Sequence, residues 1–378
     1  MTEFDPDLLD DERALRERDA GALLWQLAGS GASVRRGLSA VADIDRQRLP
    51  SDLPVRAVLI ATDIATTDIA APLIRLIRGR APVLSWSGSE LPGWAGAADV
   101  LLVASQDGLA ASLAQLVDTA GRRGLTVVAA APPESAVAAA AGRGVLIPVT
   151  AEVHPWAARW EALTPLLAAA DRLALLSTPP ALTLLADRLD AACVDYAPGR
   201  ESFENPAKTL ALQLGESFPV VAGIGVLAEA AAESIAHSLQ RIAGQRAVWA
   251  PVPSGAPRLA ALLAGNEVAD LEADFFRDRL EDGPARPRLI IVGGERDADP
   301  HAGLLDTAAD DAAWAAARRS MSALERLAER SNLRPWPVEV PDAAALCRYA
   351  CAALFGDFVA GYLALATARS TEVPADVE

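Results

Sequence analysis

The fold is decided by residues 204–253, which read ENPAKTLALQLGESFPVVAGIGVLAEAAAESIAHSLQRIAGQRAVWAPVP. The apolar run Pro219–Ala222 has the length and composition of a buried parallel strand, and it ends at Gly223-Ile224-Gly225. A helix is predicted over Leu227–Ile242, and the apolar run Ala247–Pro251 predicts the next strand. Strand, helix and strand in this order indicate a βαβ unit, and such units build a parallel sheet covered by helices.

The same alternation extends along the whole chain. Helical segments, among them Ile64–Arg78 and Leu109–Arg122, separate five buried strands that are predicted in the first half. These strands are Ala57–Ala61, Val83–Trp86, Val100–Ala104, Leu125–Ala129 and Val145–Val149. The second half adds predicted strands at Leu289–Val292 and Trp336–Val340 and predicted helices at Asp310–Arg330 and Asp342–Ala368. The sequence therefore predicts two similar α/β halves, each a doubly wound parallel sheet.

The predicted domain plan has four parts. Residues 1–50 carry two N-terminal helices, Leu9–Leu27 and Val34–Leu49, and residues 51–153 form the first α/β domain. Residues 154–200 are a mostly helical connection that Pro198 and Gly199 end, and residues 201–378 form the second α/β domain.

Composition and charge exclude several classes of protein. A net charge of −16 disfavours binding to nucleic acid or to an anionic membrane. The three cysteines show no disulfide or metal-ligand spacing, which fits a reducing cytoplasm, and no cofactor or metal is predicted. The N-terminus has no apolar signal segment. The apolar stretch Tyr349–Ala368 contains Asp357, which favours a buried helix over a membrane span.

Two segments carry a resemblance to a known family. Residues 204–253 resemble the start of the second SIS (sugar isomerase) domain of the bifunctional phosphoglucose/phosphomannose isomerases, and FGDFVAGYLALATARSTEV, residues 355–373, is similar to their C-terminal helix. The resemblance implies two SIS-like three-layer αβα sandwiches with parallel sheets, plus N-terminal and C-terminal helices. It also implies a homodimer that interconverts aldose and ketose 6-phosphates.

The resemblance further implies a site with three requirements. Two loops rich in Gly, Ser and Thr hold the phosphate through backbone N–H groups. A Glu moves a proton between C1 and C2, and a His, helped by a C-terminal Lys, opens the sugar ring.

This sequence departs from the family at each of these places. The first loop aligns with residues 63–68, DIATTD, where the glycines are lost, two carboxylates appear and Thr67 keeps a hydroxyl. The second loop aligns with residues 104–109, ASQDGL, which brings a third acid. The positions that remain comparable to ligand-binding residues are Thr66, Thr67, Ser105 and Gln106.

The catalytic positions depart as well. The family's Glu falls at or near Gly244, and its His falls near residues 256–258, APR, where there is no His. The chain ends PADVE, without a terminal Lys. In the first loop, Asp63 or Asp68 can accept the N–H bonds that would otherwise hold a phosphate, because Asp is a favoured helix cap. The phosphate cradle, formed by the loops at residues 63–68 and 104–109, would then be occupied by a carboxylate of the protein itself.

Other residues allow a functional or a structural interpretation. Glu229, Glu233 and His237 recur at helical spacing, which fits either a replacement acid/base or metal-ligand set or a solvated helix face. Gly223-Ile224-Gly225 lacks the third glycine of a dinucleotide fingerprint, because Ala228 stands there, and a tight turn explains it. The acidic loop residues Asp297, Asp299 and His301 fit a metal loop or an exposed turn, His154 fits a loop residue, and Cys347 and Cys351 fit the core.

Lys208 is the only lysine in a chain with 34 basic residues, and it lies in the segment that best matches the family. A ligand-binding role would use a compact ammonium where a planar guanidinium does not fit, whereas the structural alternative is chance survival on an exposed helix.

Three functions stay open on this basis. The chain is a catalytically degenerate homologue that regulates or scaffolds sugar-phosphate metabolism through a ligand or a protein partner, an active mannose 6-phosphate or glucose 6-phosphate isomerase with relocated groups, or a sensor of a less anionic sugar or a sugar nucleotide. The missing Glu, His and Lys favour the first.

Overall fold

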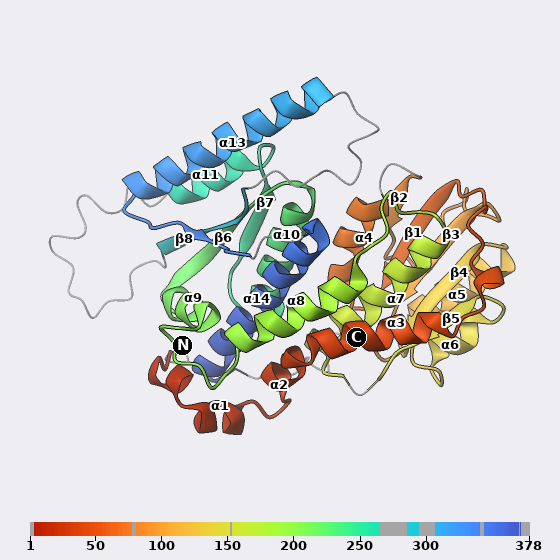
Figure 1. Ribbon diagram of the computed structural model, residues 1–378, viewed down its shortest axis with the longest axis horizontal. Coiled ribbons are helices and arrows are strands. Elements are labelled where there is room, and N and C mark those ends of the chain that lie inside the picture. The colour runs from red at the N-terminus through yellow and green to blue at the C-terminus, as the bar shows by residue number, and fades with distance from the viewer. Residues whose placement is uncertain are drawn as a thin grey trace. The chain divides into compact units, whose positions relative to one another are not determined.

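The computed structural model describes residues 4–77, 81–151, 153–264, 286–294, 307–340, 344–369 and 371, with no side chains for 307–310. The described residues divide into two compact units (Figure 1). Residues 25–193 form the first-sheet unit, and residues 4–24 together with 194–371 form the second-sheet unit. The chain therefore starts in the second-sheet unit, leaves it, and returns to it.

The first-sheet unit is built on five parallel strands in the order β2-β1-β3-β4-β5. The strands are β1 (Ala57–Thr62), β2 (Val83–Ser85), β3 (Asp99–Ala104), β4 (Thr126–Ala131) and β5 (Val145–Pro148). Each of them overlaps a strand that the apolar runs predict. Because both faces of a parallel sheet are covered, continuous apolar runs are the expected signal, and β3 is buried along its whole length.

Helices cover both faces of this sheet and make three layers. The apolar core on one face joins alternate strand residues to α5 (Ala111–Arg122) and α6 (Ala136–Ala141). The other face carries α4 (Ala70–Ile77) and α7 (Arg159–Arg172), and α3 (Ser30–Ala42) packs against α7. The unit ends with α8 (Leu182–Asp195), of which residues 182–193 lie inside it.

The second-sheet unit repeats the plan with four parallel strands in the order β7-β6-β8-β9. The strands are β6 (Ser217–Ile224), β7 (Val248–Pro251), β8 (Arg286–Gly293) and β9 (Trp336–Pro337). In Figure 1, α11 (Ala256–Ala264) and α13 (Thr307–Arg330) lie along one face, and α10 (Val226–Arg241) and α14 (Ala345–Ala366) lie along the other. Helix α9 (Pro206–Leu214) packs against α14.

Helix α14 is the core helix of this unit, as its sequence predicts. It is the one helix among the described residues that is long and apolar enough to cross a membrane, yet its apolar window is 100% buried inside the protein. Asp357, in mid-helix and 1% exposed, accepts a hydrogen bond from Ser238 Oγ at 2.5 Å and lies 3.9 Å from Arg241 Nη2. A charge that is paired inside the protein explains the interruption of the apolar run.

The N-terminal segment departs from the predicted single helix over Leu9–Leu27. It forms a 3-10 turn, Asp7–Asp10, and two short helices, α1 (Glu12–Arg18) and α2 (Leu23–Ala28). The break occurs because Asp19 turns its carboxylate to the next helix and accepts hydrogen bonds from the backbone N–H groups of Leu23 and Leu24, both at 2.9 Å. Capping therefore overrides the helical periodicity at this point.

Candidate functional site

The loop after β1 is organised around the carboxylate of Asp63. Its Oδ1 accepts hydrogen bonds from the backbone N–H of Thr66 at 2.9 Å and from the Thr66 hydroxyl at 2.7 Å. Its Oδ2 accepts from the Ser105 hydroxyl at 2.8 Å and from the backbone N–H of Gln106 at 2.6 Å. Two amides and two hydroxyls therefore converge on one carboxylate, which is the donor set that would surround a bound anion.

This carboxylate lies at the switch point of the first sheet. Strand order 2-1-3-4-5 reverses direction between β1 and β3, and open α/β sheets bind their ligands outside the carboxyl ends of the strands at that reversal. Asp63 follows β1, and Ser105 and Gln106 follow β3. Parallel pairing brings the two strand ends together, since Thr62 is the register partner of Ala104. The topology thus places Asp63 at the edge of the sheet where open α/β proteins bind their ligands.

Three of the predicted ligand-binding residues, Thr66, Ser105 and Gln106, meet at Asp63. Thr66 and Ser105 are 0% exposed. Thr67 is exposed, and its hydroxyl donates to the backbone carbonyls of Asp63 and Ile64 at 2.9 and 3.3 Å. Of the two acids in this loop, Asp63 accepts the hydrogen bonds that converge there.

The second acid of the loop, Asp68, has a different role. Its carboxylate accepts a hydrogen bond from Arg159 Nη2 at 3.0 Å, and the two side chains are 4% and 2% exposed. Asp68 therefore anchors the start of α4 to α7 through a buried ion pair, and it takes no part in the cradle.

A cavity of about 660 Å³ opens beside Asp63, at the carboxyl ends of β1, β2 and β3. Apolar side chains and short polar side chains line it, and the lining includes two acids, Asp63 and Asp107. No Lys, Arg or His is found among the described lining residues. The indole of Trp86 forms part of the wall, where its Nε1 donates to the carbonyl of Glu90 at 2.9 Å. The volume is sufficient for a small organic ligand.

A second cavity, of about 290 Å³, lies at the corresponding edge of the second-sheet unit. Gly293 and Gly294 at the end of β8, Ala228 on α10, and Arg348 and Tyr349 on α14 are among its lining residues. Glu229, Glu233 and His237, the predicted acid/base candidates, are half-buried on α10 and are not part of this lining.

The remaining candidate residues have the following positions in the structure. Within the described ranges, no group of three or more His, Cys, Asp or Glu side chains could hold a metal ion. The loop with Asp297, Asp299 and His301 lies outside the described residues. His154, 8% exposed, accepts the backbone N–H of Trp156 on Nδ1 at 3.2 Å and so begins a 3-10 turn. Cys347 and Cys351 are buried in α14.

Gly244, where the resemblance places the catalytic carboxylate, sits in a turn with a positive φ, which favours glycine. Its φ is +58°, and a Cβ there would come within 1.9 Å of Arg369 Nη1. The position therefore carries no proton-transfer group, and its backbone conformation disfavours any other residue.

Comparison with known proteins gives the family of the second half. Residues 203–370 match the bacterial phospho-glucose isomerase C-terminal SIS domain. This half is a SIS domain of that family. No curated protein sequence matches the chain.

Solved structures extend the SIS fold to the whole chain. A hypothetical protein from Thermus thermophilus superposes with a TM-score of 0.65 at 13% identity, covering 98% of this chain and 92% of its own. The C-terminal domain of glucosamine-fructose-6-phosphate aminotransferase from Francisella tularensis gives 0.62 at 10% identity, covering 92% and 96%. Tagatose-6-phosphate ketose/aldose isomerase from Escherichia coli gives 0.57 at 13% identity, covering 97% and 96%. Both sheets therefore belong to one double-SIS architecture.

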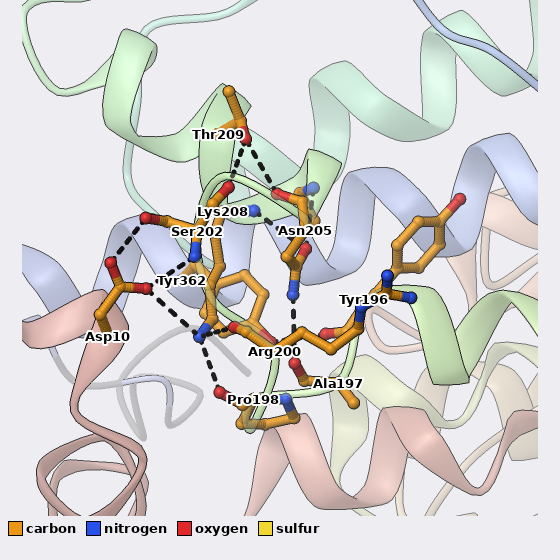
Figure 2. A network of polar contacts seen from close by, with 11 residues as sticks. Asp10, Tyr196, Ala197, Pro198, Arg200, Ser202, Asn205, Lys208, Thr209 and Tyr362 are labelled. Atoms are coloured by element: carbon orange, nitrogen blue, oxygen red, sulfur yellow. Dashed lines mark hydrogen bonds and ion pairs between the residues drawn. The ribbon is translucent and has the colours of Figure 1, made fainter.

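Lys208, the only lysine in the sequence, is buried in a polar network (Figure 2). Lys208 is 1% exposed, and its ammonium donates to the carbonyls of Pro198 at 2.7 Å and Arg200 at 2.6 Å. It lies 4.0 Å from Asp10 Oδ1 and 5.6 Å from the centroid of the Tyr362 ring. The alternative of an exposed helix position is therefore wrong. Lys208 fixes the segment before α9, and it lines neither of the two cavities above.

The rest of the ENPAK segment has an equally local explanation. Asn205 caps α9 by accepting the backbone N–H groups of Ala207 and Lys208 at 3.0 and 3.2 Å, and Pro206 occupies the first helical position. In Figure 2, Asn205 also reaches the carbonyl of Ala197. In this structure the ENPAK segment specifies the start of α9.

Sequence reasoning missed Trp86 as a cavity residue and noted Asp107 only as a third acid in the second loop. Trp86 is the last residue of a predicted strand, and Asp107 follows another, so their positions at strand ends contained the signal. What the sequence lacks is a pattern that distinguishes an acid lining a cavity from an acid in an exposed turn.

Proposed function

We propose that this chain is a non-isomerising SIS protein that binds a carbohydrate derivative in the first-sheet unit and acts as a regulatory or partner protein in sugar-phosphate metabolism. The observation that supports this proposal is that the Asp63 carboxylate accepts hydrogen bonds from all four donor groups of the cradle. Two structural neighbours are named for sugar phosphates, which supports a carbohydrate-related ligand.

The charge of the cradle opposes an ordinary phosphate ligand. A phosphate placed about 4 Å from a carboxylate is repelled by about 1 kcal/mol in water and about 4 kcal/mol near a protein surface. The donors are already used, so the phosphate would gain no compensating hydrogen bonds. An active isomerase would also need a proton-transfer group to replace the one absent at Gly244.

The test compares the parent with Asp63→Gly. Removing the carboxylate frees the amides of Thr66 and Gln106 and the hydroxyl of Ser105, while the Thr66 hydroxyl can still donate to the carbonyl of Ala104 at 2.9 Å. Calorimetric titration with inorganic phosphate and with glucose 6-phosphate is expected to show tighter binding by Asp63→Gly than by the parent. Glu134→Gln, which removes one negative charge at an exposed position of the same unit, is the matched control and is expected to bind like the parent.

A coupled assay decides the alternative function. The parent is expected to form no fructose 6-phosphate from mannose 6-phosphate or glucose 6-phosphate above background. Turnover at ordinary enzyme rates would establish an active isomerase with relocated groups and reject the proposal. Equal or weaker anion binding by Asp63→Gly would show that the loop is not a phosphate cradle.

The remaining parts of the proposal concern assembly and compartment. We expect a cytoplasmic homodimer, as the resemblance to the isomerases implies, and sedimentation velocity of the purified chain measures its oligomeric state. A monomer at micromolar concentration would reject the dimer.

A further inference from the structure

Resting on the proposed function, we infer that the cavity beside Asp63 takes a cationic, hydroxyl-bearing ligand of the class of an unphosphorylated amino sugar, and that Asp107 and Gln106 recognise it. In this inference the SIS site has exchanged its preference for an anion for a preference for an ammonium group.

The first observation is an amide oxygen left available on a buried side chain. Gln106 is 8% exposed, and its Nε2 donates to the carbonyls of Ala151 and Val153, both at 2.8 Å. Both amide hydrogens are therefore used, which fixes the orientation of the amide. Within the described part of the chain, Gln106 Oε1 receives no hydrogen bond, and Gln106 lines the cavity. At the wall of the cavity this oxygen can accept a hydrogen bond from a ligand or from water.

The second observation is the neighbouring carboxylate. Asp107 Oδ1 accepts the backbone N–H of Leu109 at 2.9 Å, and Asp107 Oδ2 has no protein donor among the described residues. Gly108, with φ +68°, holds this turn, and a Cβ there would come within 2.2 Å of Ser135. The turn therefore keeps Asp107 beside Gln106 at the cavity.

The charge and shape of the cavity select the ligand class. With two acids and no base in the described lining, the cavity repels anions and attracts cations. Donors from an ammonium and from hydroxyls match the acceptors of Asp107 and Gln106. The hydrogen bond from Trp86 Nε1 to Glu90 fixes the indole, which offers an apolar surface to a sugar ring.

The experiment is calorimetric titration of the full chain with glucosamine, glucose and glucose 6-phosphate, which share one ring and differ in charge. We run it at a pH at which the amine is protonated. Glucosamine is expected to bind about tenfold more tightly than glucose, because a charge-assisted hydrogen bond is stronger than a neutral one, and glucose 6-phosphate is expected to bind most weakly.

Asp107→Asn tests the assigned residue. Asparagine keeps the turn, because its side-chain oxygen can accept the Leu109 N–H, so the fold is retained. This variant is expected to lose about tenfold in affinity for glucosamine and little in affinity for glucose. Glu134→Gln, the matched exposed charge deletion, is expected to leave both affinities unchanged.

Equal affinity for glucosamine and glucose, no binding of either sugar, or an equal loss in Glu134→Gln would overturn the inference while leaving the proposed function standing. Tightest binding of glucose 6-phosphate together with turnover in the coupled assay would overturn the proposed function itself.

Discussion

Individual acidic side chains have distinct structural roles in the two units. Asp63 occupies the donors of a cradle, Asp68 pairs with a buried arginine, and Asp357 interrupts an apolar helix without leaving the core. In each case the neighbours of the carboxylate, rather than its residue type, determine what it does.

Asp99 supplies a pH-dependent part of the stability. Hydrogen bonds from the Arg56 guanidinium lower the pKa of this 0%-exposed carboxyl, with a further bond from the backbone N–H of Gly96. A depressed folded-state pKa means that the stabilisation is present above the unfolded pKa and is lost as the pH falls through the folded pKa. Asp99→Asn is therefore expected to be less stable than the parent at neutral pH and to lose less stability on acidification. Denaturant unfolding at several pH values, with the exposed Asp52→Asn as control, measures this difference; parallel curves for the parent and Asp99→Asn would contradict it.

Lys208 is expected to change the stability in the same direction with pH as Asp99, but in the alkaline range. Burial lowers the pKa of its amine, while Asp10, Glu201 and Glu12 oppose the shift. Between the lowered folded pKa and the unfolded pKa the unfolded chain binds more protons, so this group makes the protein more stable as the pH rises through that window. The neutral amine still has two N–H groups for its two carbonyl partners.

Lys208→Met removes both effects. It leaves the carbonyls of Pro198 and Arg200 buried without their donor, which is expected to cost about 1–3 kcal/mol in the free energy of unfolding at neutral pH. Relative to the parent, the deficit of the variant is expected to grow as the pH is raised. Unfolding curves at neutral and alkaline pH measure both quantities, and a deficit that shrinks with pH would show that the ammonium form is the favoured one.

At the scale of elements, α10 and α14 approach each other closely at a glycine. Gly356 faces Ile235, and a Cβ on Gly356 would come within 2.7 Å of Ile235 Cγ1 and 3.0 Å of its Cα. The two helices can approach this closely only because one of them has no side chain at the contact.

Gly356→Ala is expected to lower the free energy of unfolding by about 1–3 kcal/mol through overpacking. Gly121→Ala is the control, because Gly121 is an exposed residue of α5 with nothing within 4 Å of the added Cβ. There the same change is expected to be neutral or to stabilise by about 0.5–1 kcal/mol. Thermal denaturation of both variants distinguishes packing from helix propensity; similar melting temperatures for the two would contradict the close contact.

At the scale of the whole molecule, the sequence predicts the sheets well and the site poorly. All nine predicted strands are present, because parallel strands are buried on both faces and their apolar runs stand out. The prediction of one continuous N-terminal helix over Leu9–Leu27 is wrong, because the side chain of Asp19 accepts the backbone N–H groups of the next helix and ends the first one. The roles of Asp63 and Asp68 depend on partners 40 or more residues away, Ser105 and Arg159, and no local pattern specifies such distant contacts.

The N-terminal segment is expected to stabilise only the second-sheet unit. Leu8, Leu9 and Leu15 are buried there, and each contributes about 1.5–3 kcal/mol by burial. Deleting residues 1–18 is expected to lower the melting transition of the second-sheet unit and to leave that of the first-sheet unit in place. Differential scanning calorimetry measures both transitions, and an equal shift of the two would contradict the division.

The path of the chain, out of the second-sheet unit and back, has a consequence for protein synthesis. The backbone N–H of Asp5 donates to the carbonyl of Ala366 at 2.9 Å, and Arg18 Nη1 donates to the carbonyl of Leu365 at 3.2 Å. Arg18 is therefore translated 347 residues before its partner Leu365. Residues 25–193 are continuous and can fold while translation proceeds, whereas residues 4–24, with their buried leucines, stay exposed until residues 365 and 366 have been translated. During that interval Leu8, Leu9 and Leu15 are exposed apolar side chains that a nascent-chain chaperone can bind.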